Sequence, residues 1–259
     1  MKKLVTIFTI IAVALTCTSF IFDFTRANAT NSSFRAWGLK RAPEGQIPEV
    51  PKNIQDELAQ NNAIWIGDVN EKKMYLTFDC GYELGYTPKI LDALKTTNTK
   101  SIFFVTGHFV DKNPELIKRM NDDGHIIGNH SDKHLVMPKT SEEVMTADLK
   151  ALESKVKSVL GDDYVMSYLR PPKGEYSVAS LKLSQNLGYK TLFWSSAYVD
   201  WEDDKKGDLD YSFNSIAKQF HNGSIILLHN TSSNNADVLE RAINDALEKG
   251  YTFGNCSEL

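Results

Sequence analysis

The chain has 259 residues and a formal net charge of −4, with 42% hydrophobic and 24% charged residues. This is ordinary globular composition. The absence of a basic stripe or a run of like charges argues against nucleic acid as a partner, and three cysteines are too few for a disulfide-framed mini-domain.

The first 29 residues have the features of a secretory signal peptide. Lys2 and Lys3 give a positive start to an uncharged apolar run over residues 4–22. The Ala-Asn-Ala sequence at 27–29 then matches the small-x-small pattern of a signal-peptidase site. We therefore expect cleavage after Ala29 and a protein that is secreted or held at the outer face of the membrane. The apolar run is nearly long enough to span a bilayer, so an uncleaved anchor through residues 4–22 is the alternative.

Residues 30–72 are interpreted as an N-terminal extension that lies on the surface of a single domain, residues 73–259. Prolines and scattered polar residues dominate the extension. Its apolar residues are expected to anchor it on the core, namely Trp37, Ile64, Trp65 and Ile66.

From residue 73 onward, short apolar or β-branched runs alternate with helical stretches. Seven runs have the length and composition of strands: 74–78, 101–106, 125–128, 167–169, 191–195, 224–228 and 251–253. Seven strands that alternate with six helices predict a parallel sheet with helical crossovers. No glycine-rich phosphate loop follows the first run, which favours an α/β barrel, closed or nearly closed, over an open doubly wound sheet.

Several helices have readable starts. Pro88 and Pro114 are expected at first helical positions. Thr140 and Glu143 fit a capping box for the longest helix, which is predicted to end near Gly161.

Polar groups follow five of the predicted strands, at the end where parallel α/β barrels gather their chemistry. These groups are Asp79-Cys80, His130 with His134, Arg170 with Lys173, Asp200-Trp201, and His229. A carboxylate, a histidine pair, an arginine and an Asp/His couple at one barrel mouth predict a metal-assisted hydrolase.

The histidines suggest two roles. His130 and His134, with one anionic ligand and an open position for water, would form a catalytic zinc-type site; two surface histidines in a polar loop are the alternative. His229 suits a general acid, and Asp200 would fix its tautomer and raise its pKa. A buried histidine bonded to a backbone carbonyl is the alternative for His229.

Asp79 ends an apolar strand, where a carboxylate is costly to desolvate unless it is used or paired. We expect a general base that activates a water molecule at the metal, or otherwise a turn cap. Arg170 would hold this carboxylate ionised and oriented, unless the pair is a purely structural salt bridge.

In this order, the five segments resemble the polysaccharide deacetylase family, the group with the NodB homology domain, over about residues 70–259. The resemblance implies a distorted (β/α) barrel of about seven parallel strands. It also implies a role for each site residue: Asp79 as catalytic base, His130 and His134 as metal ligands, Arg170 orienting the base, the Lys173 backbone N–H at the oxyanion position, Asp200 supporting the acid His229, and Trp201 with Leu227 lining a pocket for the acetyl methyl group.

The sequences of the segments Phe78–Glu83 and Phe104–Phe109 are similar to those of one branch of the family, the delta-lactam-biosynthetic de-N-acetylases of spore-forming bacteria. This implies removal of the acetyl group from N-acetylmuramic acid in peptidoglycan, on the way to muramic δ-lactam of spore cortex. The implied partner is a glycan strand, and we expect a monomer. A deacetylase of another N-acetyl glycan, chitin-like or containing N-acetylglucosamine, is one alternative. A glycan-binding protein that has lost catalysis is the other.

Cys80 departs from the family pattern, because most members have there an aspartate that ligates the metal. Three interpretations stay open: a thiolate ligand to zinc, which zinc's preference for thiolate favours; a metal held weakly by two histidines and water; and a disulfide with Cys256, allowed outside the cell. A nucleophilic Cys80 would leave Asp79 and Arg170 without a role. The expected metal is zinc, with cobalt as the alternative.

Overall fold

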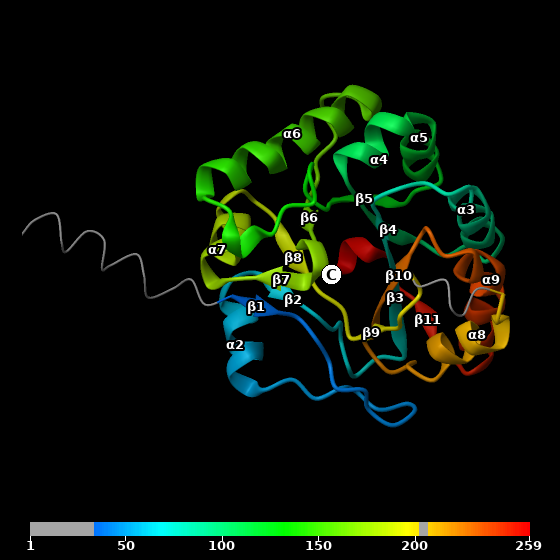
Figure 1. Ribbon diagram of the computed structural model, residues 1–259. Helices are drawn as coiled ribbons and strands as arrows, with labels where there is room; N and C mark the ends of the chain where they lie inside the picture. Colours follow the sequence, from blue (N-terminus) through cyan, green and yellow to red (C-terminus); the bar gives the residue numbers. More distant parts are fainter. Residues whose placement is uncertain (1–33, 202–206) are drawn as a thin grey trace, which may run out of the picture.

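The computed structural model describes residues 34–201 and 207–259, so the predicted signal segment lies outside the described residues. A parallel sheet curls into a half-barrel with eight helices around it in the described part of the chain (Figure 1). The helices are α2 (Lys52–Gln60), α3 (Thr87–Thr96), α4 (Gly107–Lys112), α5 (Pro114–Asp122), α6 (Glu142–Leu160), α7 (Val178–Asn186), α8 (Leu209–Ala217) and α9 (Ser233–Glu248), with 3-10 turns η1 (Met137–Lys139), η2 (Pro172–Gly174) and η4 (Cys256–Glu258).

All seven predicted strands occur, and the sheet confirms the predicted α/β barrel class. The strands are β1 (Arg35–Ala36), β2 (Ala63–Ile64), β3 (Lys73–Cys80), β4 (Ser101–Val105), β5 (Ile126–Asn129), β6 (Tyr168–Leu169), β7 (Glu175–Tyr176), β8 (Lys190–Leu192), β9 (Ser196–Ala197), β10 (Ile225–His229) and β11 (Thr252–Phe253). The sheet order is β2-β8-β6-β5-β4-β3-β10-β9, with β11 beside the start of β3, and these ladders are parallel. A separate antiparallel pair joins β1 to β7.

Two short strands differ from the expectation. Ala63 and Ile64, placed in the extension from sequence, join the sheet as β2 beside β8. The run predicted over 191–195 leaves the sheet after Leu192, and the chain pairs with β10 two residues after Trp194, as β9. The expected anchors of the extension are confirmed. Trp37 and Trp65 are buried in one cluster, against which Ile66 packs, and Ile64 packs against the cluster that contains Tyr75 and Phe104.

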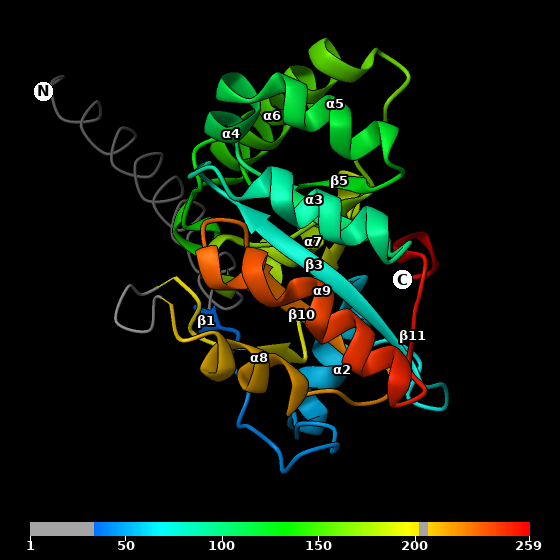
Figure 2. The same cartoon turned by 90° about the vertical axis from the view of Figure 1, so that its right-hand side faces the viewer.

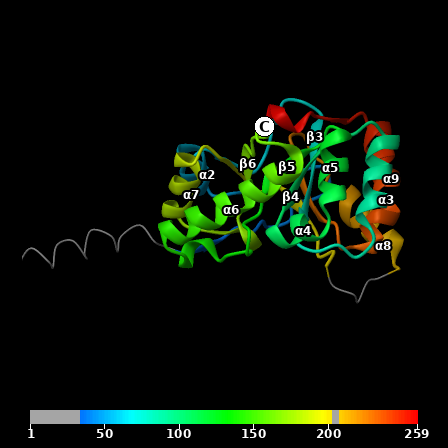
Figure 3. The ribbon, with the colours of Figure 1, turned by 90° about the horizontal axis from the view of Figure 1, so that it is seen from above.

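Helices cover the outer face of the sheet. Figure 2 shows α3 and α9 side by side over β3. In the view from above, α2 and α7 lie on one side of the molecule and α3 and α9 on the other (Figure 3). Among the described residues, no helix is long and apolar enough to cross a membrane.

The predicted helix starts are right for one proline, one residue off for the other, and wrong for the longest helix. Pro114 is the first residue of α5, whereas Pro88 is the second residue of α3, whose N-cap is Tyr86. The N-cap of α6 is Ser141, whose side chain accepts from the backbone N–H of Val144, and not Thr140. The hydroxyl of Thr140 instead donates to the carbonyl of Val136, because the turn before the helix extends one residue further than the pattern indicates.

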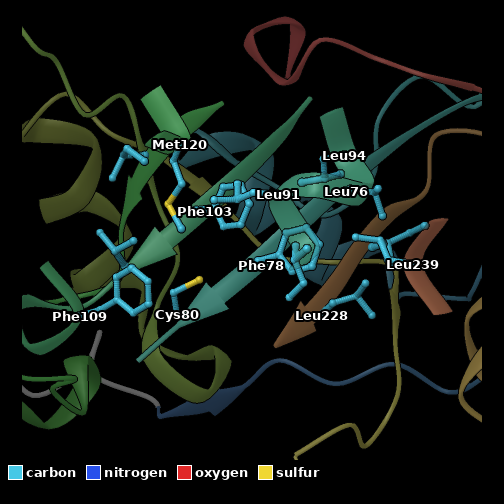
Figure 4. Packing of buried hydrophobic residues seen from close by; sticks show 14 of the residues in the cluster. Leu76, Phe78, Cys80, Leu91, Leu94, Phe103, Phe109, Met120, Leu228 and Leu239 are labelled. Carbon is cyan, nitrogen blue, oxygen red and sulfur yellow. The ribbon is translucent and has the colours of Figure 1, made fainter. Parts of the chain in front are cut away.

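Side chains along β3 alternate between two apolar layers. Phe78 and Cys80 point toward the helices, into the large cluster in which Phe78 stacks on Phe103 with ring centroids 5.0 Å apart (Figure 4). Tyr75 points to the inside of the barrel, where it packs with Phe104. Thr77 and Asp79 follow Tyr75 in this alternation, so the strand delivers Asp79 to the inside.

Candidate active site

A cavity of about 320 Å³ opens where β3, β4, β5 and β10 end. Its walls include Asp79, His130, His134 and His229, which come from three separate segments of the chain. A larger cavity, about 620 Å³, lies between residues 39–48 and α8 and is lined by other residues. The predicted chemistry therefore gathers in the smaller of the two.

Asp79 and Arg170 form a buried ion pair beneath this pocket. Arg170 Nη1 donates to Asp79 Oδ1 at 2.9 Å, and the arginine side chain has no exposed surface. Burial alone would raise the pKa of Asp79, but the charge of His130 when that ring is protonated, the charges of Arg170 and His229, and the Arg170 hydrogen bond outweigh it and lower that pKa. Asp79 is thus held as a carboxylate, the state that a proton acceptor requires.

The remaining Arg170 contacts fix the orientation of the guanidinium. Nε donates to the Leu192 carbonyl at 3.0 Å, and Nη2 donates to Thr77 Oγ1 at 2.8 Å. The guanidinium also lies 4.2 Å from the centroid of the Phe104 ring. With donors committed to several strands, the guanidinium has one orientation toward Asp79.

His229 forms the second coupled pair, with Asp200. Asp200 Oδ1 lies 2.7 Å from His229 Nδ1, and Asp200 Oδ2 accepts from the His229 backbone N–H at 2.7 Å. Burial lowers the pKa of His229, but the charge and hydrogen bond of Asp200, with the charge of Asp79, outweigh it and raise that pKa. The imidazolium form, which can donate a proton, therefore persists to higher pH than in a free histidine.

His130 and His134 lie together at the pocket wall, with ring centroids 5.1 Å apart. His130 Nδ1 is 2.8 Å from the Arg170 carbonyl. Because a carbonyl only accepts, Nδ1 carries the proton and Nε2 is free to act as a ligand. Burial lowers the pKa of His130, and partial burial with the neighbouring His130 lowers the pKa of His134 to about 4. Both rings are therefore neutral at neutral pH, as metal binding requires.

The loop that carries both histidines is fastened to helix α6 by Asp148, which is buried. Asp148 Oδ1 accepts from Ser131 Oγ at 2.6 Å and from the Asp132 N–H at 2.9 Å, and Oδ2 accepts from the Lys133 N–H at 3.0 Å. Ser131 and His134 have φ of 67° and 54°, a region that is unfavourable for side-chain-bearing residues. The Asp148 hydrogen bonds offset this cost and hold the loop in one conformation.

Cys80 does not join the histidines, and the prediction that it ligates the metal is wrong in this structure. It follows Asp79 on a pleated strand, so its side chain points to the opposite face and lies in the apolar cluster, fully buried beside Phe109 (Figure 4). Burial, followed by the charges of Asp79 and Glu83, raises the pKa of the thiol well above its ordinary value. A buried, protonated thiol is neither a ligand nor a nucleophile.

The disulfide alternative is also wrong here, because Cys80 is a free thiol. Glu258, two residues after Cys256, pairs with Lys73 at the first residue of β3, whereas Cys80 is the last residue of that strand. The C-terminal turn therefore lies at the opposite end of β3 from Cys80.

The donor set fits a divalent metal with two protein ligands. His130 and His134 present neutral imidazoles, and Asp79 Oδ2 lies 3.5 Å from His130 Nε2. Within the described ranges, no group of three His, Cys, Asp or Glu side chains is arranged to hold a metal ion. The interpretation with two histidines and water thus fits the structure, whereas the one with a thiolate does not.

The structure brings three further predicted residues to different places. Lys173 lies in turn η2 with φ of 59°, close enough to His134 for its charge to lower the pKa of that histidine. The Trp201 ring contacts His229 with centroids 5.1 Å apart and is 57% exposed. Leu227 is buried and pairs with Thr77 in the sheet. Neither Trp201 nor Leu227 lines the 320 Å³ pocket.

Sequence reasoning missed three residues that hold the site together: Asp148, Asn230 and Asn235. Asn235 Nδ2 donates to Asp200 Oδ2 at 2.6 Å, and so fixes the partner of His229. Asn230 is buried directly after His229 and donates to the Tyr82 carbonyl at 2.8 Å. The position of Asn230 directly after His229, at the end of a predicted strand, could have identified it as a site residue. Asp148 and Asn235 lie in helices, and no sequence pattern marks them as site residues.

Comparisons with known proteins agree with this geometry. A family model described as polysaccharide deacetylase matches residues 66–192. The chain is 43% identical to the peptidoglycan-N-acetylmuramic acid deacetylase PdaA of Bacillus subtilis over 223 residues, 86% of this chain and 84% of that protein. It is 34% identical to a peptidoglycan-N-acetylglucosamine deacetylase of Bacillus cereus over 238 residues, covering 86% and 85% of the two chains.

Solved structures give the same result. The structure of Bacillus subtilis PdaA, a family 4 carbohydrate esterase, superimposes with a TM-score of 0.85 at 42% identity, covering 88% of this chain and 97% of that one. A family 4 carbohydrate esterase from Bacillus anthracis gives a TM-score of 0.75 at 38% identity, with 89% and 98% covered.

Replacing Cys80 by alanine should leave metal binding unchanged, because its sulfur lies in the apolar cluster. We expect equal zinc affinities of Cys80→Ala and the unchanged protein in calorimetric titration, with His134→Ala as the variant that loses affinity. Cobalt titration of the unchanged protein should show no thiolate-to-metal charge-transfer absorption. A charge-transfer band that disappears in Cys80→Ala would show that the thiol does ligate.

Asp148→Asn should weaken metal binding by about 10- to 100-fold, the range seen when a residue that helps to orient metal ligands is lost. The amide cannot accept at both oxygen positions, so the loop with both histidines loses a hydrogen bond. Leu152→Ala, a fully buried residue of the same helix, is the matched control: it should lower the urea midpoint and leave zinc affinity unchanged. Equal losses of zinc affinity in both variants would show that Asp148 affects metal binding only through the stability of the fold.

Proposed function

The chain belongs to the polysaccharide deacetylase family, and from this premise we propose that it removes the acetyl group from N-acetylmuramic acid in peptidoglycan strands. The observation that carries the proposal is the presence of two ion pairs at one pocket: Asp79 with Arg170, and His229 with Asp200. Their environments push the two pKa values in opposite directions. Such a separation is the mark of an acid and a base that act in one reaction.

Each couple has one task in amide hydrolysis. Asp79, ionised and oriented by Arg170, would accept a proton from the attacking water. His229, protonated and oriented by Asp200, would donate a proton to the departing amine nitrogen, so that acetate and a free amine leave. The backbone N–H of Lys173 would face the carbonyl oxygen, where negative charge develops.

His130 and His134 would hold the divalent metal ion on which deacetylases of this family depend. That ion, zinc or cobalt, supplies Lewis-acid polarisation when bound. The protein's own contribution is to keep both imidazoles neutral and the loop fixed through Asp148.

The similarity to the muramic acid deacetylase PdaA supports the choice of sugar, and the similarity to an N-acetylglucosamine deacetylase keeps the second sugar as an alternative to be tested. Deacetylated muramic acid has a free amine near its lactyl carboxyl group, the arrangement from which a muramic δ-lactam can form. We further propose that the protein acts on cell-wall glycan outside the membrane, as the predicted signal peptide implies.

Asp79→Asn should abolish deacetylation, with a loss of about 100- to 10,000-fold, the contribution of a positioned base. Peptide-free and peptide-bearing peptidoglycan strands are incubated with the protein, with and without zinc or cobalt, and acetyl loss from each sugar is followed by mass spectrometry. Asp162→Asn, an exposed acid outside the pocket, should retain full activity. Acetyl loss confined to N-acetylglucosamine would contradict the proposed substrate, and none under any metal would leave a glycan-binding protein.

The pH profile of kcat/KM should have an alkaline limb above the ordinary histidine pKa of about 6.5, because the raised pKa of His229 keeps the acid protonated to higher pH. In Asp200→Asn the raising charge is gone, so the limb moves to lower pH. The lowered pKa of Asp79 keeps the base ionised across this range. Asp210→Asn, an exposed acid paired with Arg241, should show the unchanged profile, and an unmoved limb in Asp200→Asn would exclude His229 as the acid.

A further inference from the structure

We propose that Tyr82, supported by His108, is a subsite for the sugar ring next to the one that is deacetylated. The inference rests on the proposed function and extends it from the reacting sugar to the strand. Both side chains line the 320 Å³ pocket together with Asp79 and His229.

The Tyr82 ring is presented to solvent rather than used for folding. Tyr82 is 62% exposed, and its ring lies 4.8 Å from the His108 ring, centroid to centroid. An aromatic ring that is mostly exposed contributes little buried area to stability. An exposed aromatic ring that lines a catalytic pocket is instead suited to pack against a ligand.

The backbone of Tyr82 is fixed relative to the catalytic strand. Asn230, which is buried and follows His229, donates through Nδ2 to the Tyr82 carbonyl at 2.8 Å and to Glu83 Oε2 at 3.2 Å. The Glu83 carboxylate also accepts from the Thr87 hydroxyl at the start of α3. A site fixed in advance loses less conformational entropy on binding, so the network favours recognition by this ring.

The size of the pocket indicates that a strand must extend beyond it. A volume of about 320 Å³ lies at the lower end of the range for a single small ligand. The neighbouring sugars of a polymer would therefore contact the residues around the pocket. Tyr82, in the loop after β3, lines the pocket, and Trp201 contacts the His229 ring.

The chemistry of the pair matches a pyranose ring. A sugar ring has a face of C–H groups and an edge of hydroxyl groups, and tyrosine likewise combines an apolar ring with a polar hydroxyl. The His108 ring nitrogens offer a further donor and acceptor for hydroxyl groups. Tyr82 and His108 can therefore contact both the C–H face and the hydroxyl groups of a sugar ring.

Leu84 provides a matched control for the experiment. It belongs to the same loop and is 61% exposed, nearly as much as Tyr82, but it does not line the pocket. Tyr82→Ala, Tyr82→Phe and Leu84→Ala are compared for acetate release and, separately, for equilibrium binding. The ligands are peptide-free strands and a single N-acetylmuramic acid glycoside.

Tyr82→Ala should raise KM for strands and weaken strand binding by about 3- to 10-fold, as expected for one aromatic contact. Its kcat/KM for the single glycoside should stay unchanged, because that ligand does not reach the subsite. Tyr82→Phe should retain most of the strand affinity, and Leu84→Ala all of it.

The outcomes separate the two proposals. Acetate release with equal strand KM in Tyr82→Ala and Leu84→Ala would overturn the subsite and leave the proposed function intact. Strand binding that weakens only in Tyr82→Ala, with no acetate released by any form, would support the subsite and overturn the deacetylase. Loss of affinity for the single glycoside equal to that for strands would place Tyr82 at the reacting sugar and contradict the subsite.

Discussion

Arg170 is the constraint on which the rest of the site depends. Its guanidinium is fully buried inside the barrel and binds Asp79, Thr77 and the carbonyl of Leu192, while its own carbonyl accepts from His130 Nδ1. One residue therefore orients both the proposed base and one of the proposed metal ligands. Burying such a charge is costly unless geometry and hydrogen bonds compensate, and removing either partner would leave an uncompensated charge under the pocket.

The sequence was sufficient to predict that the acidic, arginine and histidine side chains at the strand ends meet, because a parallel barrel brings strand ends together whatever lies between them. Asp79, His130, Arg170 and His229 are separated by long stretches of chain and still gather at one mouth. The prediction for Cys80 failed although the same reasoning could have excluded it. If Asp79 faces the inside of the barrel, pleat alternation puts the next side chain outside with Phe78. Zinc's preference for thiolate favours Cys80 as a ligand, but the geometry of the strand turns its sulfur away from the histidines.

What the sequence could not predict is the support behind these side chains. Asp148 lies within α6 as one more polar residue of an amphipathic helix, and only the packing of that helix behind β5 reveals that it holds the histidine loop. Asn235 similarly lies in the first turn of α9, where a polar residue is ordinary. Such partners are specified by the approach of two elements in space, for which one sequence carries no periodic signal.

The electrostatics of the pocket argue for chemistry rather than simple binding. The charge of Asp79 is one of the causes that raise the pKa of His229, and the charge of His229 is one of the causes that lower the pKa of Asp79. Each group thus favours the productive protonation state of the other, a coupling that exists only while both face the same space. The charge of Arg170 lowers both pKa values, which favours the ionised form of Asp79 but disfavours the protonated form of His229. The raised pKa of His229 therefore depends on Asp200, which contacts its Nδ1. A protein that only bound glycan would gain nothing from a carboxylate with a lowered pKa and an imidazole with a raised pKa on the walls of one cavity.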